Sequence, residues 1–346
     1  MHIRYVMDWN FATTLIGSLP YSNAKEALDK MIGGNITCPA WPQLPALGYS
    51  ESMYVQTGCS LPGIDIDDAA GKMTADIDRY DPTEIYTAIL SEDLTYFSHP
   101  ERYHRGLYEF VKRDLSGFKA IKGQVTGPIS EGLQITDKKG RSVIYDESYS
   151  ELVRKTVNMT AKWQSKRLAE CNKNVILFFD EPSLTLLGTP FASVSNDQAV
   201  EWMNESMNGL ECSKAIHCCG NTDWTLVFRT DTDILSFDAY AYSHTIAMFP
   251  GEVSKFLEKG GALSWGMVPS NDDIAMTETA EHLASVLTEN INTLVKKGVD
   301  EDLLVRRSLI TPQCGLGSMG TENADRMIKM LHDLSEIMRE QYGVSE

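Results

Sequence analysis

The segment Lys214–Asn221, KAIHCCGN, joins a short apolar run to a histidine, two adjacent cysteines and a glycine. The run Lys214–Cys218 predicts a buried β-strand, and the glycine beyond it predicts a loop. In an extended chain alternate side chains share a face, so His217 and Cys219 point to one place while Cys218 points into the opposite wall. An imidazole and a thiolate placed in this way suit a borderline-soft ion such as Zn²⁺. The alternative is that the pair fills the core.

Similar apolar runs recur along the chain and alternate with helical patterns. Continuous apolar runs are typical of parallel strands that are covered on both faces. The predicted strands are Thr13–Gly17, Asn35–Cys38, Phe118–Val125, Val175–Phe179, Lys214–Cys218, Ile234–Phe237, Ala262–Val268 and Ser308–Thr311. Helical patterns include Ser148–Cys171, Asp197–Leu210, Thr277–Lys297 and Asn323–Tyr342. This order predicts an α/β fold, a (β/α)₈ TIM barrel, as a single domain over residues 1–346, and a doubly wound open sheet is the alternative.

Two connecting segments are distinguished by their polar composition. The segment Tyr49–Asp68 is rich in Gly, Ser and Asp, and predicts a long loop after the second strand. Loops in this position lie on the catalytic face of a barrel. The segment Asp137–Tyr145, DKKGRSVIY, predicts a polar hairpin before a long helix.

The composition excludes several classes of protein. With 346 residues, 42% of them hydrophobic and 23% charged, the chain has the composition of a globular protein. Its net charge of −17 disfavours binding to nucleic-acid phosphates and to anionic lipid. No apolar run has transmembrane length, and residues 1–10, MHIRYVMDWN, lack the apolar core of a signal peptide. We therefore expect a cytoplasmic protein with no nucleic-acid or membrane partner.

A third cysteine extends the predicted metal site. Cys314 follows the last predicted strand, and because the ends of all barrel strands share one rim it can reach His217 and Cys219. Three ligands from distant strand ends leave a fourth position open, which is the pattern of a catalytic zinc. Asp238 ends the intervening strand and could supply an oxygen ligand that a substrate thiolate displaces. The remaining cysteines are expected to be structural: Cys38, Cys59, Cys171, Cys212 and Cys218.

Other polar residues close other predicted strands. After the first strand, Gly17 lets a ligand approach the backbone, and Ser18 can donate or accept a hydrogen bond there. VTGP at Val125–Pro128 closes the third strand. Asp180 and Glu181 follow two buried aromatic residues of the fourth strand, and this carboxylate pair suits a substrate ammonium group. The alternative is that one of the two caps the next helix or holds a neighbouring loop.

Five motifs together resemble the catalytic C-terminal half of cobalamin-independent methionine synthases. They are TTLIGSLP at Thr13–Pro20, VTGP at Val125–Pro128, DEP at Asp180–Pro182, HxC at His217–Cys219 and QCG at Gln313–Gly315. The motifs keep the family's order and cover nearly the whole chain. The chain also resembles the wider barrel superfamily of uroporphyrinogen decarboxylase and the methylcobalamin:coenzyme M methyltransferases. Decarboxylases of that superfamily lack the zinc set, so the resemblance favours the methyltransferases.

The resemblance implies a zinc-dependent methyltransferase that forms methionine from homocysteine. It assigns Zn²⁺ to His217, Cys219 and Cys314, which with the substrate-binding Asp180 are the expected catalytic residues. The family's acidic zinc ligand is a glutamate, and the matching strand here ends in Asp238.

The resemblance also implies where homocysteine binds. The serine of the IGS motif and the aspartate of the DEP motif hold it in the family, which points to Ser18, with its neighbour Gly17, and to Asp180. Glu51, in the long second loop, is expected to contact the substrate amine.

Two departures from the family concern the methyl donor. Long members carry an N-terminal half that helps hold a polyglutamated folate, whereas this chain starts almost at the IGSLP motif. They also carry a histidine that protonates the departing folate nitrogen, whereas Leu263–Ser270, LSWGMVPS, holds none. A folate nitrogen is a poor leaving group without an acid. Cobalt departs with the bonding electrons and needs none, so we expect methylcobalamin or a methylated corrinoid carrier protein as donor.

Two other functions stay open at the level of the sequence. The same zinc chemistry could methylate coenzyme M or another thiol, although the DEP and IGS motifs favour an amino-acid acceptor. A non-catalytic zinc- or corrinoid-binding protein is the alternative from another class. A closed site of the four-cysteine type would be expected there, and the proposed open position argues against it.

Overall fold

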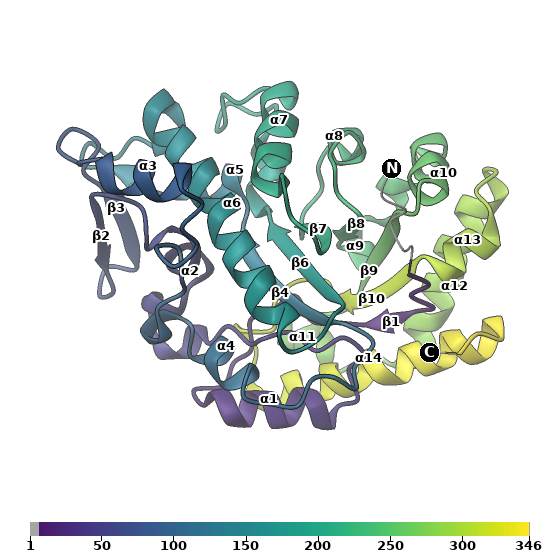
Figure 1. Cartoon of the computed structure of the whole chain (residues 1–346). Helices are drawn as coiled ribbons and strands as arrows, with labels where there is room; N and C mark the ends of the chain where they lie inside the picture. The colour runs from purple at the N-terminus through teal and green to yellow at the C-terminus, as the bar shows by residue number, and fades with distance from the viewer. Residues whose placement is uncertain (1–6, 346) are drawn as a thin grey trace.

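A curled sheet of parallel strands forms the centre of the computed structural model, which describes residues 7–345 (Figure 1). The first six residues of the segment without a signal-peptide core therefore lie outside the described residues. The sheet has seven strands in the order β1-β10-β9-β8-β7-β6-β4. These strands are β1 (Ala12–Thr13), β4 (Ile121–Thr126), β6 (Val175–Asp180), β7 (Ser213–Cys218), β8 (Ile234–Phe237), β9 (Ala262–Val268) and β10 (Ser308–Pro312).

Helices follow the strands and surround the sheet (Figure 1). The four helical patterns predicted from the sequence are confirmed as α6 (Glu147–Ala169), α7 (Asn196–Met207), α12 (Ala280–Lys296) and α14 (Thr321–Tyr342). The others are α1 (Ala24–Gly33), α2 (Met53–Gly58), α3 (Thr83–Leu90), α4 (Arg105–Phe110), α5 (Pro128–Gln134), α8 (Trp224–Phe228), α9 (Ala239–Ile246), α10 (Pro250–Glu258), α11 (Asp272–Ala275) and α13 (Glu301–Arg306). Of the helices in residues 7–345, none is long and apolar enough to cross a membrane.

Of the predicted first strand, Thr13–Gly17, only Thr13 belongs to β1. The predicted second strand, Asn35–Cys38, is wrong, and with it the closed ring of eight strands. This segment is irregular because Asn35 has a left-handed φ of 56° and Pro39, which lacks an N–H donor, follows it. It still lies between the two edge strands of the sheet. Cys38 N donates to Thr13 O at 2.9 Å and Lys122 N donates to Pro39 O at 2.9 Å. Within residues 7–345 the result is a curled open sheet whose gap is bridged by irregular chain.

One side chain takes over part of the missing strand's role. Gln164, from α6, accepts a hydrogen bond from Gln124 N at 2.9 Å and donates to Gln124 O at 3.0 Å, as a neighbouring strand would. The same amide accepts from Trp41 Nε1 at 2.9 Å and meets His99 Nε2 at 2.8 Å. Gly123 leaves the room for this amide, because a Cβ there would clash with Gln164 Oε1. The backbone N–H and C=O groups of Gln124 at the edge of β4 therefore have hydrogen-bond partners without a regular neighbouring strand.

Two apolar clusters pack against the curled sheet, one on its outer face and one on its inner face. The larger cluster packs the outer face of the sheet against the helices. A smaller cluster fills the inside near the amino ends of the strands, and its members include Ala12, Ala120, Ile176, Ala215, Ile234 and Ala262. Buried polar residues follow further along the same strands, among them Lys122, Asp180, His217 and Ser236. The polar groups thus gather toward the carboxyl ends, where barrel-type folds place their functional sites.

Of the two polar connecting segments, the one predicted as a loop contains a helix and a strand. The segment predicted as a loop, Tyr49–Asp68, contains α2 and the strand β2 (Ile64–Asp67). The latter pairs with β3 (Lys72–Ala75), which pairs in turn with β5 (Thr136–Asp137). The predicted hairpin is present, since Asp137 N donates to Arg141 O at 2.8 Å.

Candidate active site

Three potential metal ligands meet at the carboxyl end of the sheet. His217 lies in β7, Cys219 follows that strand and Cys314 follows β10. One ligand atom from each of these residues lies within 4.8 Å of the other two. The structure therefore brings together residues that are far apart in the sequence.

The His217 ring is oriented by a neighbouring strand. Its Nδ1 shares a hydrogen bond of 3.0 Å with Ser236 Oγ in β8. Its Nε2 is buried and has no hydrogen-bond partner in the part of the chain that the structure describes. When Nδ1 carries the proton toward Ser236, Nε2 presents a lone pair, which is the arrangement that metal-binding histidines usually have. An unpaired buried nitrogen is costly, so this atom fits a group bound between His217 and the two thiols.

The three neighbouring cysteines differ in environment. A hydrogen bond from the Cys219 thiol lowers the pKa of Cys314 and favours its thiolate, and the charge of His217 acts in the same direction, although burial opposes this effect. Cys218 instead lies in the apolar cluster outside the sheet, and burial raises its pKa to about 12. Its Sγ contacts Gly220 O at 3.5 Å. A thiolate is the form that binds metal, so Cys314 suits a metal. The hydrogen bond to Cys314 and burial raise the pKa of Cys219, which is a candidate ligand because of its place beside His217 and Cys314, where Cys218 does not lie.

The two acidic residues of the DEP motif have different roles. Glu181 is buried and accepts hydrogen bonds from Ile129 N at 2.9 Å and Ser130 N at 2.8 Å, at the first turn of α5. Gly127 of the VTGP motif permits this approach, because a Cβ there would clash with the Glu181 carboxylate. Burial raises the pKa of Glu181 to about 7. Glu181 therefore holds the start of α5, and Asp180 is the member of the pair that is left for the site.

Asp180 lies next to the candidate metal ligands. It pairs in register with His217 across β6 and β7. Its Oδ1 is buried and finds no hydrogen-bond partner within residues 7–345. Burial raises the pKa of Asp180, while the charge of Lys122 and then that of His217 lower it. A buried carboxylate oxygen beside the ligand group can accept a hydrogen bond from a cationic substrate group.

The first motif, IGS, contacts the loop that carries Cys314. Gly17 has a φ of 149°, and a Cβ there would lie 2.9 Å from Gln43 Oε1, so the position needs a glycine. Ser18 Oγ accepts a hydrogen bond from Gly317 N at 3.4 Å. Gly17 and Ser18 thus lie beside the segment that follows Cys314.

The other two predicted site residues, Glu51 and Asp238, accept hydrogen bonds from neighbouring protein groups. Glu51 is buried and accepts from Arg105 N at 3.2 Å and Gln56 Nε2 at 3.1 Å, and burial raises its pKa to about 7. Asp238 accepts from the first turn of α9 at 2.9 Å and from Gln313 Nε2 at 3.1 Å. The ligand group of three does not include Asp238, so its role as a fourth ligand stays a prediction.

Two buried charged residues near the site, Lys122 in β4 and Glu131 in α5, were not predicted from the sequence. Both carboxylate oxygens of Glu131 lack a hydrogen-bond partner among the described residues. Burial raises the pKa of Glu131 well above its usual range, and the charge of Glu181 raises it further. The only sequence signal was a charge inside an apolar run, which does not distinguish a buried residue from an exposed one.

Glu131→Gln is expected to remove part of the pH dependence of stability. The folded protein holds a proton on Glu131 that the unfolded chain releases at its lower, ordinary pKa. The contribution of protonated Glu131 to the free energy of unfolding is therefore fully present at low pH, and it is lost as the pH rises toward the folded-state pKa. The loss is about 1.4 kcal/mol for each pH unit over which only the folded state is protonated. Glutamine cannot ionise, so the variant should lose less stability between about pH 5 and about pH 8 in urea unfolding.

The matched control for this experiment is Glu201→Gln, at an exposed position of α7. It should keep the wild-type pH dependence. Glu51 and Glu181 also have pKa values raised to about 7, so some dependence should remain in the Glu131 variant. A Glu131 variant whose unfolding free energy changes with pH as steeply as that of the wild type would contradict the interpretation.

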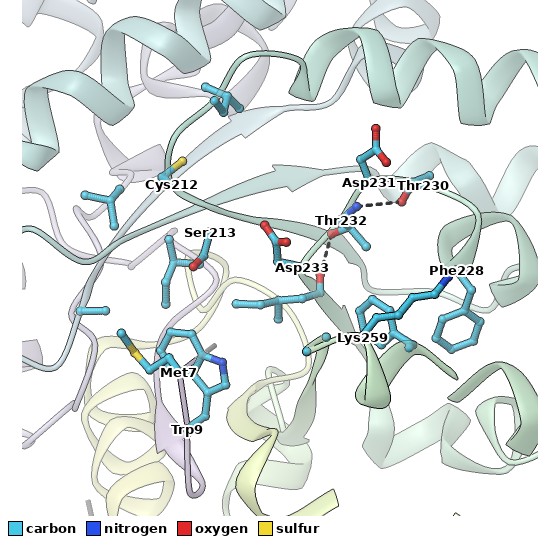
Figure 2. Close-up of a pocket in the computed structure, with 18 of the residues that line it drawn as sticks. Met7, Trp9, Cys212, Ser213, Phe228, Thr230, Asp231, Thr232, Asp233 and Lys259 are labelled. Carbon is cyan, nitrogen blue, oxygen red and sulfur yellow. Dashed lines mark hydrogen bonds between the residues drawn. The ribbon is translucent and has the colours of Figure 1, made fainter. Parts of the chain in front are cut away.

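A cavity of about 1080 Å³ opens at the other end of the sheet (Figure 2). Its lining includes Met7, Trp9, Cys212 and Asp233, beside the amino ends of β6, β7 and β8. The candidate ligands lie at the carboxyl ends of the strands, so this cavity is not part of their site.

The curled parallel sheet with surrounding helices defines an α/β protein of the barrel type. The structure is similar to that of a B12-independent methionine synthase from Shewanella sp. W3-18-1 in complex with selenomethionine, with a TM-score of 0.60 and 16% sequence identity over 96% of this chain and 98% of that chain. It is also similar to a methyltransferase from Methanosarcina mazei, with a TM-score of 0.57 and 13% identity over 92% of this chain and 85% of that chain. At these identities the likeness establishes a shared fold. No protein-family model and no curated protein matches the sequence.

Proposed function

We propose that the protein is a zinc-dependent methyltransferase that forms methionine from homocysteine. The observation that carries this proposal is the convergence of His217, Cys219 and Cys314, with the unpaired Nε2 of the histidine among them. One nitrogen and two sulfurs suit zinc and leave a coordination position open. Zinc, when bound there, would favour the thiolate form of an acceptor thiol. The shared fold with a methionine synthase in complex with selenomethionine supports the choice of acceptor.

The surrounding residues have complementary tasks in this proposal. Asp180 accepts a hydrogen bond from the ammonium group of homocysteine, because its Oδ1 is buried without a partner in residues 7–345. Ser18 offers a hydroxyl beside the loop that carries Cys314. Together they hold the amino-acid end of the acceptor while its sulfur faces the three ligands. Holding the reactants in place in this way removes much of the entropic barrier of a two-molecule reaction.

The donor in this proposal is methylcobalamin or a methylated corrinoid protein. The acceptor thiolate attacks the methyl carbon, the carbon–cobalt bond breaks and cobalt keeps the electron pair. No proton is needed by that leaving group, whereas a folate nitrogen needs an acid. The stretch that carries a histidine in the folate enzymes runs here through β9, where Trp265 and Met267 are buried.

An assay of zinc-loaded protein tests the proposal. Homocysteine and coenzyme M are each combined with methylcobalamin and with methyltetrahydrofolate, and the methylated thiol is measured. We expect methionine from homocysteine and methylcobalamin, and little or no product with the folate. Preference for coenzyme M would change the acceptor but not the chemistry, and efficient corrinoid-free turnover with methyltetrahydrofolate would overturn the donor. No methyl transfer in any combination would overturn the methyltransferase itself.

A further inference from the structure

Lys122 places a buried ammonium group inside the sheet, below the candidate site. Its side chain is fully buried, and its Nζ donates to Ile16 O at 2.6 Å and to Gln124 Oε1 at 2.9 Å. The same Nζ lies 4.2 Å from the centre of the Phe178 ring. A buried charge is tolerated only where such contacts compensate for the lost water. The contacts of this ammonium are therefore specific to its place in the sheet.

These contacts join the two edges of the open sheet. Lys122 belongs to β4, and Ile16 follows β1, while no regular strand pairing connects these edge strands within residues 7–345. Ile16 stands two residues before Ser18 in the chain. Phe178 stands two residues before Asp180 in β6, so these two side chains share a face of the strand. The ammonium group thus contacts the chain just below each of the two residues proposed to hold the amino-acid end of homocysteine.

Gln124 adds a second connection to the same turn. Its Oε1 accepts from Lys122, and its Nε2 donates to Trp41 O at 3.0 Å, which fixes the orientation of the amide. Gly17 packs directly on this amide, since a Cβ at that position would lie 3.0 Å from the amide carbon. Lys122 therefore supports both residues that precede Ser18, one directly and one through Gln124.

We propose that Lys122 is a positioning residue that sets Ser18 and Asp180 at the spacing needed to bind the ammonium-bearing end of the acceptor thiol. This inference rests on the proposed function and deepens it, because it assigns acceptor specificity to a residue outside the candidate ligands and outside the residues proposed to bind the acceptor. Burial lowers the pKa of Lys122 to about 7 and the charge of Asp180 opposes this shift, so the two groups attract each other when both are ionised. Ser236 orients the candidate ligand His217, but His217 also stacks on Phe178, with ring centroids 6.5 Å apart, so the metal content of each Lys122 variant is measured before binding is compared.

Lys122→Met separates positioning from stability. Methionine keeps the length of the side chain, but removing one partner of a buried charge pair is destabilising, so binding is compared only once the unfolding curve shows that the variant is folded. Lys122→Gln serves as a second variant that keeps one donor, and unfolding curves with metal content establish that each variant is intact. Lys173→Met, at an exposed lysine, is the matched control.

The readout is binding to protein loaded with Co²⁺, whose visible spectrum changes when a thiolate joins its ligands. Two probes are titrated: homocysteine, and 4-mercaptobutyrate, which is homocysteine without its amino group. In Lys122→Met the Kd for homocysteine should rise by about tenfold or more, the scale of one charge-assisted hydrogen bond lost or misplaced. The Kd for 4-mercaptobutyrate should stay within about twofold of the wild-type value, and the control should change neither.

Each outcome decides either the role of Lys122 or the proposed function. An unchanged Kd for homocysteine in a folded, metal-loaded Lys122→Met protein overturns the positioning role and leaves the proposed function standing. An equal rise in the Kd of both thiols indicates a general structural defect and also overturns the role. The same comparison of the two Kd values is made with Lys122→Gln. A wild-type protein whose Co²⁺ spectrum responds to neither thiol overturns the proposed function and the role together.

Discussion

Cys314→Ser is expected to lose nearly all of the zinc that the wild-type protein binds, while Cys218→Ser keeps it. A serine hydroxyl stays protonated at neutral pH and is a far weaker zinc ligand than a thiolate. Cys314 meets His217 and Cys219 at the carboxyl end of the sheet, whereas Cys218 lies in the outer apolar cluster. Loss of a hydrogen-bond partner of a metal ligand typically lowers the metal affinity roughly 10- to 100-fold. Loss of the ligand itself should therefore lower the affinity more than about 100-fold.

Zinc per chain, measured by mass spectrometry of the purified proteins and by competition with a chelator, checks this result. Ser236→Ala supplies an intermediate case, because it removes the partner of His217 Nδ1 but leaves the three ligands in place. It should weaken zinc binding by roughly 10- to 100-fold. Equal loss of metal from the Cys218 and Cys314 variants would mean that the wrong cysteine has been paired with His217.

The strands that the sequence predicts well are those made mostly of apolar residues. Val175–Phe179 and Ala262–Val268 have no interrupting proline or left-handed residue, and both form strands of the sheet. The predicted second strand failed because its few apolar residues were not enough to override Asn35 and Pro39. Its place between the edge strands is nevertheless kept, through long-range contacts that no local pattern encodes.

The site shows the same limit of sequence reasoning. The alternation of side chains along a strand was enough to predict that His217 and Cys219 converge and that Cys218 does not. It could not decide between Asp180 and Glu181, because that choice depends on where α5 begins in space. It also could not find Lys122, whose contacts come from segments far away in the chain.

Gln164→Met is expected to lower the free energy of unfolding by about 3 kcal/mol or more, although this residue lies in a helix outside the sheet. Methionine matches glutamine in length and lets the site stay filled, so the change removes hydrogen bonds rather than volume. The amide of Gln164 contacts both backbone groups of Gln124 as well as the side chains of Trp41 and His99. Each buried group left without its partner costs about 1–3 kcal/mol, and the costs do not simply add.

Urea unfolding of the wild type, Gln164→Met and the exposed Gln134→Leu provides the measurement, and the last of these should change stability by less than about 0.5 kcal/mol. Gly123→Ala gives an independent route to the same effect, because a methyl group there would displace the amide from β4. A Gln164→Met protein as stable as the wild type would show that the edge of β4 needs no such support. If the loss is as large as expected, the open side of the sheet is held by individual side chains, and the residues above it depend on them for their position.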